Sequence, residues 1–294
     1  SLTASSPVSK RLSPRKMAFI TGTLLLTSTG FICRILGFFY RIFMSRTIGA
    51  EGLGIYNMVH PIFSICFAVC AGSIQTALSQ YVAANQTRGR AVFRTGLVIA
   101  MGMSFLLAWV IYGNAGFLAE KLLLEPRCAP YLPVMAVSVP FAALHACING
   151  YYYGMQKARV PAFSQVAEQV IRMGAVFLIA SIWLESGRQI TVSLAVYGHL
   201  IGEMASAVFT VFCLGFFPPC KDGDSRRAPA IPLSFGATAA PLMALALPLM
   251  GNRLILNVLG SAEAIWIPNR LMSSGLTNSE ALSVYGVLTS MALP

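Results

Sequence analysis

The sequence predicts an all-α protein that crosses a membrane several times. Hydrophobic residues make up 56% of its 294 residues and charged residues 11%, whereas an average soluble domain carries about 25% charged residues. The mean hydropathy is +0.70. Several apolar runs also reach the about 20 residues that a helix needs to cross a bilayer. A soluble globule of this length could not cover its surface with so few charges.

The apolar runs and the segments between them predict seven helices and the start of an eighth. The expected helices span 17–44, 55–84, 95–113, 128–153, 162–184, 191–217 and 234–270, and the eighth begins near 281. The expected connecting segments are 46–54, 85–94, 114–127, 154–161, 185–190, 218–232 and 271–280.

This pattern predicts four regions. They are a disordered basic tail at 1–16, a first six-helix bundle at 17–217, a polar linker at 218–232 and the start of a second bundle at 233–294. We expect a native start near Met17, and further sequence after Pro294, because Pro294 stands in an apolar run too short to span. The first apolar run follows basic residues, as in a secretory signal. No small-residue cleavage site follows it, so a retained helix is expected.

The distribution of basic residues predicts which side of the membrane each segment faces. Twelve of the 21 Lys and Arg residues fall in the tail and in alternate connecting segments: Lys10, Arg11, Arg15, Lys16, Arg88, Arg90, Arg94, Lys157, Arg159, Lys221, Arg226 and Arg227. Cytoplasmic loops carry such an excess, so the N-terminus is predicted to be cytoplasmic. Because the charges are spread over separate loops, nucleic acid is not an expected partner.

A weak internal repeat supports the division into two bundles. Residues 41–56 align without gaps with 270–285, at an offset of 229, and five of the sixteen positions are identical. The two copies lie at the ends of the first and the seventh expected helix, and an even number of membrane crossings separates them. They are therefore expected to run in the same direction, as in transporters whose halves are related by an axis along the membrane normal.

Charged residues inside the expected spans are the candidate functional residues, because an ionised group at the bilayer centre costs about 2.5–3.5 kcal/mol on insertion scales. They are Arg34, Arg41, Arg172, Arg253, Glu168, Glu203 and Glu263, with Arg270 at the edge of a span. The arginines could instead extend to the interface. Glu168 and Arg172 stand four residues apart and can neutralise each other. Glu203 has no partner nearby in the sequence, so it is either an ion-coupling site or the counter-ion of an arginine on another helix.

Other polar residues predict neither a metal site nor a catalytic centre. The seven cysteines include no CxxC pair. His145 and Asn149 share a helix face, for which core hydrogen bonding is the preferred interpretation, and His199 lies in Gly198-x-x-x-Gly202, a spacing that permits close helix packing. No nucleophile has a base and an acid nearby, and no Gly-rich phosphate loop precedes a helix. We therefore expect no cofactor and no enzymatic activity.

Two stretches resemble a known family. The first runs from Thr21 to Thr27 and continues through Arg34-Ile-Leu-Gly-Phe-Phe-Tyr-Arg41 and Gly49-Ala-Glu-Gly-Leu-Gly-Ile-Tyr56. The second runs from Ala246-Leu-Pro248 and Asn252-Arg-Leu254 through Ile267-Pro-Asn-Arg-Leu271 to Tyr285-Gly286. Both resemble the stage V sporulation protein B family, in the polysaccharide-transporter branch of the multidrug/oligosaccharidyl-lipid/polysaccharide flippase (MATE-like) superfamily.

The resemblance implies a transporter that works by alternating access between two six-helix bundles. This chain would supply the first bundle, helix 7 and the start of helix 8. The family is also similar to lipid II flippases, in which arginines line a cationic cavity; Arg34 and Arg270 match those motifs best, and Arg41 and Arg253 are further candidates for substrate binding. The implied substrate is a lipid-linked oligosaccharide or peptidoglycan precursor, whose diphosphate suits the permanently charged, paired donors of arginine.

These observations predict a flippase for cell-wall, spore-cortex or polysaccharide biosynthesis in a bacterial plasma membrane. Glu168, Arg172, Glu203 and Glu263 are candidates either for proton or sodium coupling or for ion pairs within the protein. Two alternatives remain open. One is a cation-coupled multidrug exporter of the same superfamily, although 17–44 contains no acidic residue. The other is a membrane scaffold that recruits cell-wall enzymes without transporting anything.

Overall fold

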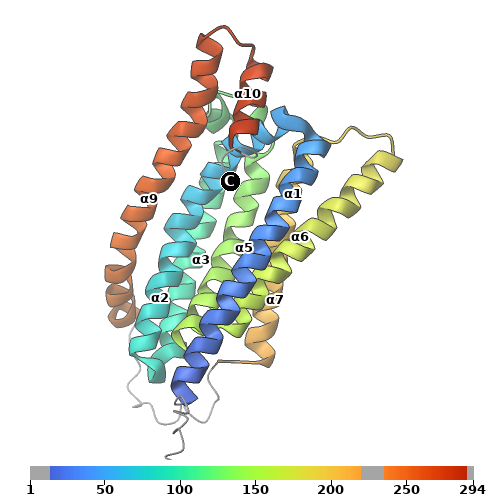
Figure 1. The fold of residues 1–294 in the computed structure, drawn as a ribbon. Helices are drawn as coiled ribbons and strands as arrows, with labels where there is room; N and C mark the ends of the chain where they lie inside the picture. The colour runs from blue at the N-terminus through green and yellow to red at the C-terminus, as the bar shows by residue number, and fades with distance from the viewer. Residues whose placement is uncertain (1–13, 220–234, 290–294) are drawn as a thin grey trace, which may run out of the picture.

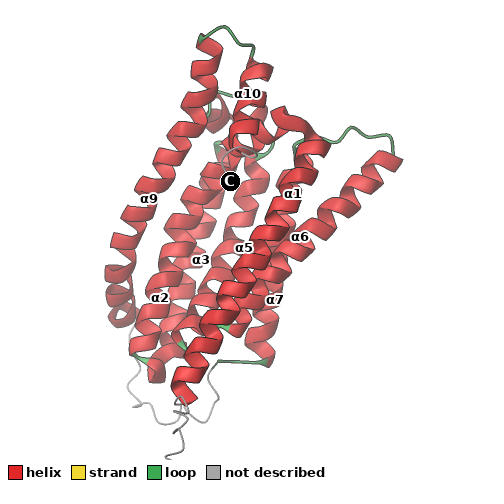
Figure 2. Cartoon of the chain, viewed as in Figure 1, coloured by secondary structure: helices red, strands yellow, loops and turns green. Residues whose placement is uncertain are grey.

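The computed structural model describes residues 14–219 and 235–289, and in this part helices are joined by loops and turns, with no strand (Figure 2). The long helices are α1 (Pro14–Phe67), α2 (Ser73–Ala84), α3 (Gly89–Gly113), α5 (Leu132–Gly154), α6 (Arg159–Glu185), α7 (Ser193–Phe216), α9 (Phe235–Ser273) and α10 (Asn278–Val287). Short helical turns are η1 (Ala68–Gly72), η2 (Gln86–Arg88), α4 (Ala115–Phe117), η3 (Leu118–Leu122) and η4 (Pro126–Cys128).

Six helical stretches among the described residues are long and apolar enough to cross a membrane. The first, Ile20–Ala84, has 65 residues, far more than the about 20 of one crossing. It bends at Gly49, so it supplies two crossings (Figure 1). The prediction of an all-α polytopic membrane protein is confirmed. Most of the expected tail 1–16 and linker 218–232 lies outside the described residues.

The bend at Gly49 replaces the loop expected over 46–54. Gly49 has φ 75° and ψ 174°, and the chain is helical on both sides of it. An L-residue rarely adopts this positive φ, whereas glycine has no Cβ to clash. One residue therefore redirects the chain where the apolar pattern predicted nine non-helical residues.

We call the helices from α1 to α7 the first bundle, and α5 is its central helix. It packs against α2, α3 and α7, and α6 packs against α7 and α1 (Figure 1). Small residues permit these contacts: a side chain at Gly150 would meet the backbone of Gln75, and one at Gly198 would meet Val176 of α6. The close packing predicted from the Gly198-x-x-x-Gly202 spacing is therefore present, and the partner helix is α6.

Helices α9 and α10 lie against the outside of this bundle. α9 packs along α1 and α2, and α10 packs on α1 near the bend. The α10 crossing brings the two repeat copies together, because Gly54 lies against Leu282, which is the counterpart of Leu53. Gly286 similarly lies against the carbonyl of Ala50. The end of one repeat copy therefore packs against the end of the other.

Polar contacts also connect the helices at the end of the molecule where α10 packs on α1. Arg127 Nη1 donates to Glu51 (2.6 Å) and Arg127 Nε to Glu125 (2.9 Å). Asn278 Nδ2 of α10 donates to the other oxygen of Glu125 (2.8 Å). We call Glu51, Glu125, Arg127 and Asn278 the α10 contact. It links α10 to both α1 and the segment before α5.

We expect acidic pH to weaken the α10 contact. Burial raises the pKa of Glu125, but hydrogen bonds from Arg127 and Asn278 outweigh burial and leave that pKa below its usual 4.5. A carboxyl group with a lowered pKa stabilises the folded state above the unfolded pKa, and this stability is lost as the pH falls through the folded value. The midpoint temperature of thermal unfolding of the complete protein is therefore expected to decrease as the pH is lowered below about 4.5.

The measurement is the transition temperature of the purified protein as a function of pH. Glu125→Gln is expected to flatten this dependence, because the amide does not titrate in this range. Glu120→Gln, at an exposed position of the same connecting segment, is expected to retain it. Identical pH profiles for both variants would show that another group is responsible.

Candidate functional site

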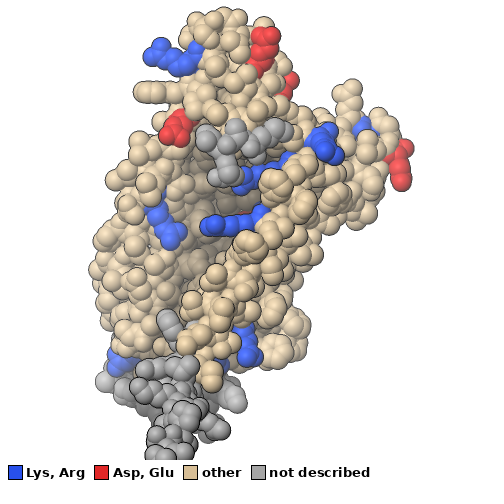
Figure 3. Space-filling view, viewed as in Figure 1, with Lys and Arg blue, Asp and Glu red and all other residues tan. Residues whose placement is uncertain are grey.

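A cavity of about 540 Å³ lies between α9 and the first bundle. It is smaller than the hollow of about 1080 Å³ beside the start of α1, but it contains four of the eight charged candidate residues. Figure 3 shows this face hollowed, with basic side chains in and around the hollow and the visible acidic ones toward the α10 end and the end of α6. The polar and charged lining residues are Tyr56, His60, Ser64, Gln75, His145, Asn149, Ser164, Gln165, Glu168, Arg172, His199, Glu203, Ser206, Arg253 and Asn257.

Helix α9 contributes Arg253, which extends toward the first bundle. Its Nη2 donates to Thr76 Oγ1 of α2 (3.1 Å). A side chain at Gly72 would collide with the Arg253 guanidinium. The glycine therefore leaves the space that Arg253 needs to reach the cavity. Among the described residues no carboxylate forms an ion pair with Arg253. Its charge is therefore available to an anion that enters the cavity.

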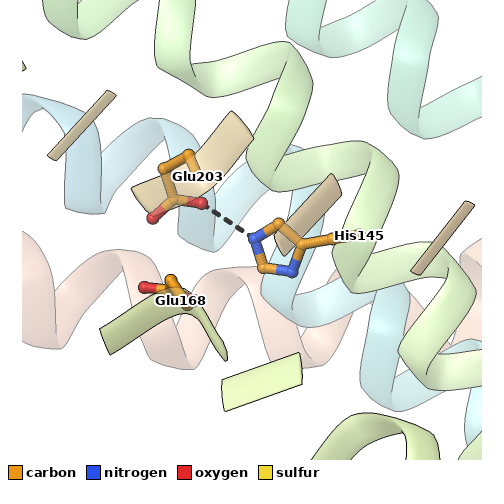
Figure 4. Close-up of side chains that lie close together, drawn as sticks. All are labelled: His145, Glu168 and Glu203. Carbon is orange, nitrogen blue, oxygen red and sulfur yellow. Dashed lines mark hydrogen bonds and ion pairs between the residues drawn. The ribbon is translucent and has the colours of Figure 1, made fainter. Parts of the chain in front are cut away.

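The opposite wall carries a buried ionic cluster, which consists of His145 of α5, Glu168 and Arg172 of α6, and Glu203 of α7. Arg172 Nη2 donates to Glu168 Oε1 and lies 3.8 Å from Glu203 Oε1. His145 Nε2 lies 2.8 Å from Glu203 Oε2 (Figure 4). We call these four residues the ionic cluster. Gly202 makes room for it, because a side chain there would collide with the Arg172 guanidinium.

The other two histidines of the chain, His60 and His199, border this cluster. His199 Nε2 lies 3.9 Å from Glu203 Oε1, and the rings of His60 and His199 have centroids 5.5 Å apart. From the sequence we predicted core hydrogen bonding for His145 and no role in the site for His60 and His199. The available signal was that all three polar rings fall inside apolar spans, but a single sequence does not show that they face one another.

Three residues of the ionic cluster have the geometry of metal ligands. One ligand atom each from His145, Glu168 and Glu203 lies within 4.8 Å of the others. However, Arg172 bonds Glu168 and borders Glu203. The fixed positive charge of Arg172 repels a divalent cation. The residues of the cluster are therefore better suited to neutralising one another than to binding a metal ion.

A further hollow of about 350 Å³ adjoins the cavity of the ionic cluster and contains Arg41. Tyr56, His60 and Arg172 line both hollows. Arg41 therefore lines the same hollow as Arg172 of the ionic cluster. Tyr40, from the preceding position of α1, lines this hollow with it.

The remaining predicted residues lie elsewhere on the described part of the chain. Arg34 is exposed on α1 and lines neither hollow, and Glu263 is exposed on α9. Arg270 is exposed beside Trp266 in a shallow groove near the end of α9. The structure thus brings Glu168, Arg172, Glu203 and Arg253 into one cavity, places Arg41 next to it and leaves Arg34, Glu263 and Arg270 outside it.

Comparison with known proteins gives matches along most of the chain. Residues 19–287 match the family model described as polysaccharide biosynthesis protein. Stage V sporulation protein B of Bacillus subtilis (strain 168) is 30% identical over 284 residues, which cover 95% of this chain and 54% of that protein. The sporulation protein YkvU of the same organism is 19% identical, over 94% of this chain and 60% of its own length.

A lipid flippase is also among the relatives. The lipid II flippase MurJ of Bacillus subtilis (strain 168) is 23% identical over 206 residues, which cover 64% of this chain and 38% of the flippase. The chain therefore spans about half the length of these relatives, between 38% and 60%.

Proposed function

Because the chain belongs to the polysaccharide biosynthesis protein family, in the polysaccharide-transporter branch of the flippase superfamily, we propose that the complete protein is a flippase. It moves a lipid-linked anionic glycan precursor across a bacterial plasma membrane by alternating access, with the N-terminus in the cytoplasm. The relatives support a lipid-linked substrate in general. The proposal that this is a peptidoglycan, cortex or polysaccharide precursor rests on their names.

The observation that carries the proposal is Arg253, a permanent cation in a membrane cavity with no carboxylate partner among the described residues. A diphosphate headgroup can leave water only if the protein replaces its hydration with donors. Arginine supplies paired, charge-assisted hydrogen bonds for this purpose. The polyprenyl tail stays in the bilayer, so the cavity needs to hold only part of the substrate. No covalent chemistry is required.

We propose that the other arginines contribute less to substrate binding than Arg253 does. Arg41 lines the adjoining hollow, where it can contact the sugar or the second phosphate. Arg34 and Arg270 are exposed in the described part of the chain. They contact substrate only if further elements of the complete protein close over them.

The test is translocation of a fluorescent polyprenyl-diphosphate disaccharide by the complete protein in proteoliposomes. We expect Arg253→Gln to lower the apparent affinity about 10- to 100-fold, because a hydrogen bond to a charged group contributes about 1.5–3 kcal/mol. Gly72→Ala is expected to reduce affinity less, because its methyl group displaces the guanidinium without removing it. The matched controls are Arg188→Gln, at an exposed position, and Gly102→Ala, where a side chain meets open space.

The outcomes separate the alternatives. Unchanged translocation in Arg253→Gln would contradict the assigned role of this residue. Proton-driven efflux of a cationic dye, without glycan translocation, would favour a multidrug exporter. A scaffold would support cell-wall assembly in cells and move no probe in vesicles.

A further inference from the structure

The ionic cluster is one positive charge short of neutrality. Glu168 and Glu203 provide two carboxylates, and Arg172 provides one guanidinium. The groups are buried, since the side chains of Arg172 and Glu203 are 14% and 7% exposed. In such surroundings an unbalanced charge is unfavourable. The cluster is therefore built to accept one further positive charge.

His145 is positioned to carry that charge. An ionised carboxylate can only accept a hydrogen bond, so the Glu203 Oε2 contact at 2.8 Å requires a proton on His145 Nε2. The other ring nitrogen, Nδ1, then has a free lone pair when the ring is neutral. Nδ1 is buried and has no hydrogen-bond partner among the described residues. A proton added at Nδ1 produces an imidazolium ion next to a carboxylate, which completes the charge balance.

Other titratable and charged groups face the cluster from each helix around it. Helix α1 contributes Tyr40, Tyr56 and His60, α7 contributes His199, and α9 contributes Arg253 across the cavity. His60 and His199 pack against each other and against Phe63. Only His145 lies within hydrogen-bonding distance of Glu203, so it is the histidine whose charge the cluster stabilises most directly.

A proton suits this geometry better than a metal ion or Na⁺. His145 Nε2 and Glu203 Oε2 already share a hydrogen bond at 2.8 Å, so a metal ion or Na⁺ could bind both atoms only after that hydrogen bond is broken. Arg172 already bonds Glu168. A proton needs one acceptor atom and no further ligands.

We propose that His145 and Glu203 form a proton-binding pair and that its proton is bound together with the anionic headgroup at Arg253. This inference rests on the proposed function. Arg253 and the ionic cluster line the same cavity, so the negative cluster repels an incoming diphosphate until it is neutralised. For charges about 10 Å apart at an effective dielectric constant of about 20, this repulsion changes affinity by about tenfold for each unit charge. Protonation and headgroup binding therefore favour each other.

The experiment measures binding of the polyprenyl-diphosphate disaccharide to the complete protein in nanodiscs between about pH 5 and 9, a range in which histidine charge changes. Proton uptake on binding is followed with a pH-indicator dye in weak buffer. For the unmodified protein we expect about tenfold tighter binding at the acidic end. We also expect uptake of up to one proton per bound molecule.

Two variants are expected to act in opposite directions. Glu203→Gln removes the excess negative charge, so binding is as tight as in the acidic unmodified protein and no longer depends on pH. His145→Gln removes the group that takes up the neutralising proton, so the cluster keeps its excess negative charge at every pH. Binding is then as weak as in the unmodified protein at alkaline pH, and it is also independent of pH. Glu185→Gln, the same substitution at an exposed position at the end of α6, retains the normal pH profile.

Several results would overturn the inference. Equal weakening by Glu203→Gln and His145→Gln would indicate a structural role for the pair. Binding that requires Na⁺ or is abolished by a chelator would assign the cluster to a metal cation. Tight binding without proton uptake would refute the proton pair and leave the flippase proposal intact, whereas no binding at any pH would refute the flippase proposal itself.

Discussion

Replacing Arg172 with methionine is expected to destabilise the protein by about 3–5 kcal/mol, because removal of one partner of a buried ion pair leaves an uncompensated charge. In this chain two carboxylates lose their cation at once: Glu168, which Arg172 bonds directly, and Glu203, 3.8 Å away. Glycine at 202 provides the space that the guanidinium needs. The measurement is the free energy of unfolding of the complete protein in detergent.

The double variant Arg172→Met with Glu168→Gln is expected to recover part of this loss. It leaves Glu203 as the single carboxylate, and protonated His145 can balance it. Arg188→Met, at an exposed position after α6, is expected to change stability little. If Arg172→Met unfolds at the same denaturant concentration as the unmodified protein, the ionic cluster does not contribute to the stability of the bundle.

The second large effect is expected at Gly286, where α10 crosses α1. A methyl group at this position would collide with the backbone carbonyl of Ala50, and one at Gly54 would collide with that of Leu282. Backbone atoms cannot rotate away as a side chain can, so the helices must separate. Overpacking costs about 1–3 kcal/mol, and we expect Gly286→Ala to lower stability by this amount.

Hydrogen exchange at the backbone amides of 278–287 reports on this contact, because local opening sets the exchange rate. We expect faster exchange there in Gly286→Ala and no change in Gly215→Ala, where a side chain meets no atom within 4 Å. Unchanged exchange in Gly286→Ala would show that the crossing adapts without separating. The crossing joins the two repeat copies, so exchange at 278–287 also reports on the contact between them.

The positions of the spans could be predicted from the sequence, because each apolar run has to be long enough to cross the bilayer whatever its neighbours are. The connections were less predictable. The segment 46–54 is polar and glycine-rich and was expected to be a loop, yet a positive φ at Gly49 redirects the chain within one residue. Composition over nine residues carries no information on which single glycine takes that conformation.

The candidate site, too, could be predicted from the sequence only in part. The sequence by itself determined an all-α membrane protein of a flippase-related family, and it showed which charged residues lie within apolar spans. Only the tertiary structure decided which of them meet: Glu168, Arg172, Glu203 and Arg253 share a cavity with His145, whereas Arg34 and Arg270 are exposed in the described part of the chain. The physical reason is that position along a helix fixes the depth of a residue in the membrane. The direction it faces depends on close packing between helices, here at glycines such as Gly72 and Gly202.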